Sequence, residues 1–188
     1  MKITFLGTGT SQGIPMIAND DPVCLSNDSK DKRLRSAIMI SWETNCYIID
    51  CGPDFRQQML RENVQSINGV LFTHEHADHT AGIDDLRPFT YKMGEVPIYA
   101  QKRVIDNLKI RFSYIFETEN RYAGAPKLSE NIVGSSSFLL QRMLVTPINV
   151  MHGKLPIIGY RFNNVAYITD LKTISSKEIK KLLNLEVL

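Results

Sequence analysis

The chain has 188 residues, of which 43% are hydrophobic and 22% are charged, and its formal net charge is +2. This composition predicts a single globular domain over the whole chain, residues 1–188. The small net charge disfavours a nucleic-acid-binding surface, and no apolar run is long enough to cross a bilayer. Cys24, Cys46 and Cys51 are an odd and sparse set, which indicates a reducing cytoplasm without structural disulfides.

Nine short segments are predicted to be β-strands because each is apolar or alternating and is bounded by turn residues. They are Lys2–Leu6, Ala37–Ser41, Cys46–Asp50, Gly69–Thr73, Pro97–Ala100, Phe138–Leu140, Leu144–Val150, Ile158–Phe162 and Val165–Thr169. Asn163 and Asn164 join the last two segments. Asparagine tolerates positive φ, so this pair predicts a tight hairpin.

Three segments are predicted to be helices: Phe55–Glu62, Lys102–Phe112 and Lys177–Leu185. A capping box precedes the last one, with Ser175 three residues before Glu178. Residues 118–137 are polar and weakly patterned, which predicts a mobile loop. Strands outnumber helices, and the helices fall between groups of strands. The sequence therefore predicts an α+β architecture, with helices packed outside the sheets.

A glycine-rich segment, Gly7–Gly13, follows the first strand directly. Its glycines allow close approach of the backbone to a ligand or to another loop. A dinucleotide-binding loop is excluded because Ile14-Pro15 comes next and no helical pattern follows. A tight loop at the rim of a sheet and a direct substrate contact both stay open.

Three of the four histidines, His74, His76 and His79, fall within six residues, and Asp78 lies among them. Imidazole and carboxylate groups are the ligands that borderline divalent metals prefer. Alternate side chains of an extended segment share a face, so His74 and His76 can chelate one ion. Asp78 and His79 come where the chain turns and can bind a second ion. The pattern therefore indicates a two-metal hydrolytic site.

Further candidates also follow predicted strands. His152 is the fourth histidine and would supply a third imidazole to the first metal. Asp170 could bridge two metals, or it could be the N-cap of the following segment. Asp50 could accept a hydrogen bond from a ligating histidine and so fix its tautomer, or it could be a simple turn residue.

Arg33 and Arg35 precede a predicted strand, and Arg87 follows the histidine segment. Guanidinium groups near a metal site suit a phosphate or carboxylate substrate, which makes these arginines candidate substrate-binding residues. A solvated, charged stretch is the alternative interpretation.

The segment His74-x-His76-x-Asp78-His79, followed by His152 and Asp170 in the later ligand positions, resembles the metallo-β-lactamase superfamily. Four further segments resemble its PhnP-like branch, the phosphoribosyl cyclic phosphate phosphodiesterases. These segments are Gly7–Pro15, Arg33–Ser36, Asp50–Arg56 and Thr80–Arg87. The resemblance covers essentially the whole chain.

The resemblance implies a four-layer αβ/βα sandwich of two mixed sheets, with helices outside and the metals at one edge. It implies two divalent ions, Zn or Mn, and a small cyclic or linear phosphodiester as substrate, attacked by a metal-bound hydroxide. The implied ligands are His74, His76 and His152 for the first ion, Asp78 and His79 for the second, and Asp170 between them. Asp78 is also the predicted catalytic residue.

The chain departs from the family pattern in two ways. Family members usually carry a cysteine cluster after the first loop, whereas this chain has only Cys24 there, so no structural zinc is expected. The family also has later histidines, and this chain has none after His152. Because the sequence ends on an incipient strand, Leu185–Leu188, the C-terminal part of the fold is expected to be missing.

Two rival hypotheses follow. One is a ribonuclease or an acyl ester, thioester or lactone hydrolase of the same superfamily, although the lack of a basic bias disfavours RNA. The other is a catalytically impaired relative that keeps a metal-binding fold. A homodimer is a further expectation, because an unfinished sheet edge at Leu188 would favour strand pairing.

Overall fold

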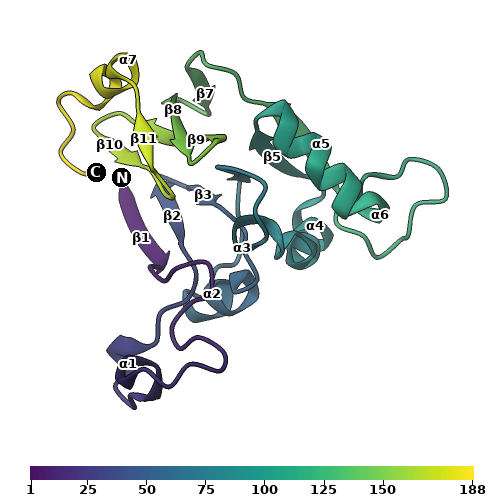
Figure 1. Cartoon of the computed structure of the whole chain (residues 1–188). Coiled ribbons are helices and arrows are strands. Elements are labelled where there is room, and N and C mark those ends of the chain that lie inside the picture. The colour runs from purple at the N-terminus through teal and green to yellow at the C-terminus, as the bar shows by residue number, and fades with distance from the viewer. The chain divides into compact units, whose positions relative to one another are not determined.

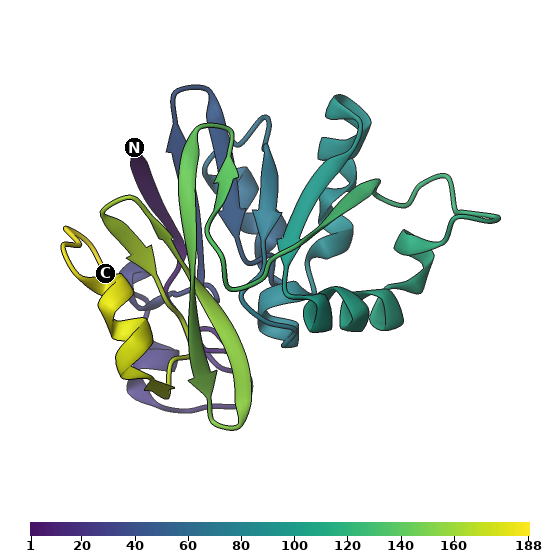
Figure 2. The same cartoon turned by 90° about the horizontal axis from the view of Figure 1, so that it is seen from above.

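The computed structural model describes residues 1–188 (Figure 1, Figure 2). The chain divides into two compact units, Met1–Asn131 and Ile132–Leu188, and each unit is built around its own sheet. Whether the units form the one predicted domain stays a prediction. None of the helices combines the length and the apolar character that a membrane span requires.

A six-stranded mixed sheet forms the N-terminal unit, with its strands in chain order. The strands are β1 (Lys2–Gly7), β2 (Ala37–Trp42), β3 (Asn45–Ile49), β4 (Gly69–Leu71), β5 (Val96–Ala100) and β6 (Leu128–Ile132). β2 is antiparallel to both β1 and β3, whereas β3, β4 and β5 are parallel to one another. It follows that β1, β3 and β4 point the same way and end at the same edge of the sheet.

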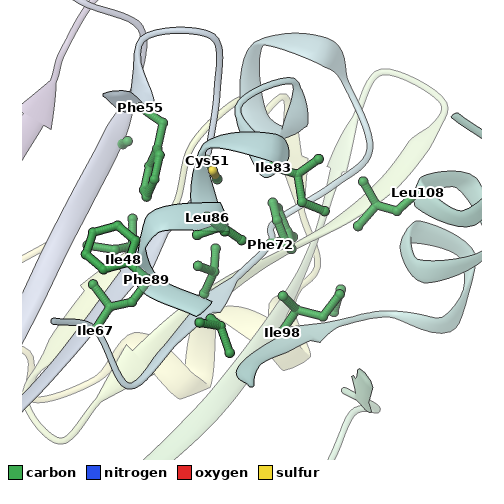
Figure 3. Packing of buried hydrophobic residues seen from close by; sticks show 14 of the residues in the cluster. Ile48, Cys51, Phe55, Ile67, Phe72, Ile83, Leu86, Phe89, Ile98 and Leu108 are labelled. Carbon is green, nitrogen blue, oxygen red and sulfur yellow. The ribbon is translucent and has the colours of Figure 1, made fainter. Parts of the chain in front are cut away.

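Helices cover one face of this sheet. Register pairs Ile48 with Val70 and Val70 with Ile98, so these side chains form a row on one face. The longer helices α2 (Phe55–Arg61), α4 (Arg87–Met93) and α5 (Lys102–Arg111) bury apolar side chains in the same cluster, including Phe55, Phe89 and Leu108 (Figure 3). Burial of this face against the helices stabilises the unit.

Short helical turns connect these elements. They are α1 (Pro22–Leu25), η1 (Ser29–Asp31), α3 (Ala77–Thr80), η2 (Ile83–Leu86) and α6 (Ser113–Phe116). The sequence analysis missed all of them and also α4, since a segment of one or two turns carries too little apolar periodicity to be recognised.

An antiparallel sheet forms the C-terminal unit, in the order β10-β9-β8-β11, and β7 also pairs with β8. Its strands are β7 (Phe138–Leu140), β8 (Met143–His152), β9 (Leu155–Phe162), β10 (Val165–Tyr167) and β11 (Thr173–Ile174). The helical turns α7 (Ser176–Ile179) and η3 (Lys180–Leu182) follow. Ile148, Val150, Ile157 and Ala166 form its small core.

All nine predicted strands are present, but several boundaries differ. β4 ends at Leu71 rather than at Thr73, so the histidine segment begins beyond the strand. β9 begins three residues early, at Leu155, because Gly153 adopts a φ of 62° and turns the chain directly from β8. The predicted Asn163-Asn164 hairpin is present between β9 and β10, and Asn163 has a φ of 52°.

Three other predictions were wrong. Residues 118–137 contain the strand β6, because tertiary pairing at the sheet edge outweighs the polar sequence. The second sheet is antiparallel rather than mixed. The expected strand Leu185–Leu188 is only an isolated bridge, in which Ala166 N donates to Val187 O at 3.0 Å.

The predicted capping box is half formed. Ser175 Oγ accepts from Glu178 N, but the Glu178 carboxylate does not return to Ser175. Its Oε2 instead accepts from Asn149 N on β8 at 2.7 Å and pairs with Lys181 Nζ at 2.8 Å. The contact with Asn149 ties α7 to the sheet. The predicted helix Lys177–Leu185 is present only as α7 and η3, which ends at Leu182.

We expect Glu178→Ala to lower the free energy of unfolding by about 1–3 kcal/mol, because Asn149 N–H would lose its acceptor. Burial raises the pKa of Glu178, but hydrogen bonds from Lys181 and Asn149 lower it more, and the net shift is downward. The stabilisation should therefore be complete above the unfolded pKa and be lost as pH falls through the folded pKa. Urea denaturation at several pH values measures both effects. Lys177→Ala is the exposed control, and equal midpoints for the two variants would contradict the prediction.

Candidate metal centre

The histidine segment and Asp50 lie at one edge of the first sheet, because the parallel strands β3 and β4 end there. Backbone hydrogen bonds join the two segments: Cys51 N donates to His79 O at 2.8 Å, and Gly82 N donates to Cys51 O at 2.9 Å. Gly52 permits this contact, since a Cβ at its position would lie 2.0 Å from Asp78 O. The segment that carries the ligands is therefore held by backbone contacts.

Three imidazoles gather in this unit. The ring centroid of His74 is 4.6 Å from that of His76 and 4.2 Å from that of His79. His74 and His79 are buried, whereas His76 is exposed. Asp78 and His79 lie on the single turn α3, where the sequence analysis expected only a turn of the chain. The N-terminal unit thus brings together the four side chains of the predicted motif.

A buried carboxylate, Asp50, orients two of these histidines. Its Oδ2 lies 2.7 Å from His79 Nδ1 and 2.9 Å from Thr73 Oγ1, and its Oδ1 accepts from Thr73 N at 2.8 Å. A carboxylate can only accept, so His79 Nδ1 carries the proton and Nε2 keeps a lone pair. The hydrogen bond that the sequence predicted between Asp50 and a histidine of the motif is present.

Thr73 fixes the tautomer of His74 in the same way. The single hydroxyl proton of Thr73 is donated to Asp50, so Thr73 Oγ1 can only accept from His74 Nδ1, which is 2.9 Å away. His74 therefore has the same tautomer as His79, with its lone pair on Nε2. The pair Asp50–Thr73 sets both buried imidazoles in the state that binds metal.

These side chains fit a divalent metal. His79 Nε2 lies 3.1 Å from Asp78 Oδ2, and in this tautomer both atoms offer lone pairs. Two acceptors at this distance repel each other unless a cation lies beside them. Imidazole nitrogen and carboxylate oxygen are the donor set of zinc and of related metals.

Two arginines of α5 hold the histidine segment from outside. Arg103 Nη1 pairs with Glu75 Oε1. Arg111 Nη1 donates to Glu75 O at 2.7 Å and to Thr80 Oγ1 at 3.0 Å. These contacts were not predicted; the sequence shows only two basic residues, eight positions apart, within the predicted helix Lys102–Phe112. Their partners are set by tertiary structure and have no sequence signal.

The C-terminal unit carries the two remaining predicted ligands. His152 is the last residue of β8, and Asp170 follows β10 with a φ of 54°. One ligand atom of His152 lies within 4.8 Å of one of Asp170. The alternative role of Asp170 as an N-cap is wrong, because the next helix begins at Ser176 and its cap is Ser175.

The three candidate substrate arginines differ in what they contact. Arg35 Nη1 pairs with Asp54 Oδ1 at 2.9 Å, and Arg87 Nη2 pairs with Asp84 at 2.7 Å. Arg33 Nη1 donates to Thr8 Oγ1 at 3.1 Å. Carboxylates thus neutralise Arg35 and Arg87, whereas Arg33 contacts a neutral hydroxyl.

The glycine-rich loop lies at the rim of the sheet and is paired with the segment that carries these arginines. Gly9 N donates to Leu34 O at 2.7 Å, and Ile14 N donates to Arg33 O at 2.8 Å. A Cβ at Gly7 would lie 2.0 Å from Arg35 O. The rim-loop interpretation therefore accounts for Gly7, and the loop's second predicted role, a direct substrate contact, stays a prediction.

Comparison with known sequences identifies the family of this chain. The model of the Beta-lactamase superfamily domain matches residues 45–188. An octanoyltransferase of Porphyromonas gingivalis is 41% identical over 183 residues, covering 96% of this chain and 37% of that protein. A ribonuclease Z of Methanococcus maripaludis is 27% identical over 174 residues, covering 88% of this chain and 49% of that protein. The chain spans less than half the length of these curated relatives.

Solved structures give the same fold. A diphosphatase from the PhnP family is 37% identical, with a TM-score of 0.90 over 98% of this chain and 72% of that chain. Zn²⁺-bound PqqB from Methylobacterium extorquens is 18% identical, with a TM-score of 0.75 over 100% of this chain and 71% of that chain. The second likeness shows the fold alone. Together with the family match, these structures confirm the predicted α+β metallo-β-lactamase fold.

Replacing Asp50 tests the orienting role of its carboxylate. We expect Asp50→Asn to weaken zinc binding by roughly 10- to 100-fold, because a neutral amide makes His79 less basic and no longer fixes its tautomer. Competition with a chromophoric chelator measures the affinity, and circular dichroism checks the fold. Asp106→Asn, an exposed change on α5, is the matched control. Equal zinc affinity in both variants would refute the role.

Proposed function

Because the chain belongs to the metallo-β-lactamase superfamily, and within it to the PhnP-like branch, we propose that it is a metal-dependent phosphodiesterase. Its proposed substrate is a small cyclic or linear phosphodiester. The observation that carries the proposal is the set of His74, His76, Asp78 and His79 oriented by buried Asp50. A diphosphatase among the solved relatives supports chemistry at phosphorus.

We propose that the predicted ligands bind two divalent ions, Zn or Mn. His74, His76 and His152 would hold the first ion, Asp78 and His79 the second, and Asp170 would lie between them. Ions bound there would supply Lewis acidity and a lowered pKa for water at the site.

The residues of this chain have separate tasks in the proposed reaction. Asp50 and Thr73 keep the lone pairs of His74 and His79 on Nε2. Asp78 is the proposed catalytic carboxylate: its Oδ2, beside His79 Nε2, would be the metal ligand, and its other oxygen can accept the proton that attacking water loses. Among the three candidate arginines, we propose Arg33 for a phosphate group of the substrate other than the reacting one, since Arg35 and Arg87 are already neutralised by carboxylates.

An acyl ester or thioester hydrolase is the second candidate. A relative that is 41% identical bears the name octanoyltransferase, which denotes acyl transfer. This chain spans only 37% of that protein, however, so most of the protein that bears the name has no counterpart here. A ribonuclease is the third candidate, supported by the 27% identity to ribonuclease Z.

Parallel assays separate these candidates. We expect the zinc- or manganese-loaded protein to hydrolyse bis(p-nitrophenyl) phosphate and to leave p-nitrophenyl octanoate and a precursor transfer RNA intact. Release of p-nitrophenolate at 400 nm measures the first two reactions, and gel electrophoresis measures the third. Turnover of the octanoate ester alone would overturn the proposal in favour of acyl chemistry, and cleavage of RNA alone would favour a ribonuclease.

Metal content tests the proposed ligand set. We expect about two ions per wild-type chain, as in other two-metal sites, and about one in Asp170→Asn, because an amide is a weaker, uncharged ligand. Turnover of the model diester should fall by roughly 10²-fold or more. Glu186→Gln, an exposed change in the same unit, is the control. Unchanged metal content and turnover in Asp170→Asn would exclude Asp170 from the centre.

A wild-type chain that binds one ion or none would support the impaired relative instead. That result would agree with the absence of histidines after His152.

A further inference from the structure

A basic cleft of about 390 Å³ lies at the end of β1 in the N-terminal unit. Its cationic lining consists of Lys30, Lys32, Arg33 and Arg61, which surround the backbone of Gly7 and Thr8. No acidic side chain lines it. Four positive charges around one small cleft raise the local concentration of anions.

The two arginines of the cleft are held in place by hydrogen bonds and one ion pair. Arg61 Nη2 donates to Leu6 O at 2.9 Å, and its Nε pairs with Glu62 Oε1 at 2.8 Å. Arg33 is oriented by its hydrogen bond to Thr8 Oγ1. Each guanidinium has further donors, and a fixed planar fork matches the oxygens of a phosphate group.

The two lysines complete the cationic lining. Lys30 and Lys32 are exposed, and Lys32 Nζ also donates to Ser26 O. The neighbouring acidic residues, Asp31 and Glu62, do not line the cleft. The positive charge is therefore uncompensated within the cleft itself, in contrast to Arg35 and Arg87 beside their carboxylates.

The topology of the first sheet relates this cleft to the histidine segment. β1 and β4 point the same way, so Gly7 and the residues after Leu71 come to the same edge of the sheet. Three strand spacings separate β1 from β4, which is roughly 14 Å. A ligand that spans this distance can reach both the cleft and the histidines.

We propose that the basic cleft binds a second phosphate group of the substrate, at a site separated from the histidine segment by three strand spacings, roughly 14 Å across the sheet. This inference rests on the proposed phosphodiesterase function. It restricts the substrate class to diesters that carry another phosphate at a distance, which a minimal diester such as bis(p-nitrophenyl) phosphate lacks.

The cleft is tested first without metal. Calorimetry measures binding of inorganic pyrophosphate to the EDTA-treated protein at about 50 mM salt, where surface charges are weakly screened. We expect the double variant Lys30→Gln/Lys32→Gln to bind pyrophosphate at least about tenfold more weakly than wild type. Lys127→Gln, an exposed change next to β6 at the opposite edge of the sheet, should match wild type. Equal binding by all three proteins, or none by wild type, would overturn the cleft as a phosphate site.

Kinetics then identify the source of the phosphate. One substrate is the p-nitrophenyl ester of thymidine 5′-monophosphate, and the other is the same ester extended by two thymidine nucleotides. We expect the lysine double variant to raise KM for the longer ester about tenfold more than for the shorter one, with kcat less affected. Equal changes in KM for both esters would show that a separate anion uses the cleft, which overturns its role as a substrate subsite.

The two proposals fail in different ways. If wild type hydrolyses neither ester, the phosphodiesterase function fails, and the role of the cleft as a substrate subsite fails with it. The pyrophosphate measurement then still decides whether the cleft binds phosphate.

Discussion

The buried carboxylate of Asp50 is the group on which the arrangement of the histidine segment in the N-terminal unit depends. A carboxylate without exposure to water is costly unless several donors compensate its charge. Thr73 N, Thr73 Oγ1 and His79 Nδ1 supply these donors. These donors belong to Thr73 and His79. The same contacts that compensate the charge therefore also fix the position and tautomer of two imidazoles. The hydrogen bonds that stabilise buried Asp50 are thus the same bonds that orient the ligands.

Backbone conformation places the carboxylates. Asp50 and Asp170 both follow strands, and both have a positive φ, 66° and 54°. Residues other than glycine adopt this backbone conformation at a cost in free energy. Asp50 comes directly after β3, and Asp170 comes three residues after Tyr167, the last residue of β10. Strain of this kind persists only where surrounding contacts determine it, and for Asp50 these are the hydrogen bonds to Thr73 and His79.

The sequence predicted these residues because metal chemistry restricts which side chains can serve. Histidines and an aspartate packed into six positions after an apolar strand have few other interpretations, so the motif, its strand and Asp50 could be found from the pattern. The contacts of Arg103 and Arg111 with the segment around Glu75 could not, since they join positions about 30 apart and depend on where α5 packs. For the same reason, β6 was missed: its pairing partner, and not its own composition, makes it a strand.

Local charge tells more about the ligand than net charge does. A formal net charge of +2 argued against a polyanion, because averaged over the molecule the positive and negative groups nearly cancel. The structure shows how they cancel. Arg35, Arg87 and Arg103 lie against carboxylates, so their charge is neutralised within the fold. In the cleft at the end of β1, Arg61 pairs with Glu62, which lies outside the cleft, whereas Lys30, Lys32 and Arg33 have no carboxylate beside them in its lining. Attraction of an anion depends on this local excess of positive charge and on its position at the edge of the sheet where the histidine segment lies. Neither the local charge nor its position can be obtained from composition.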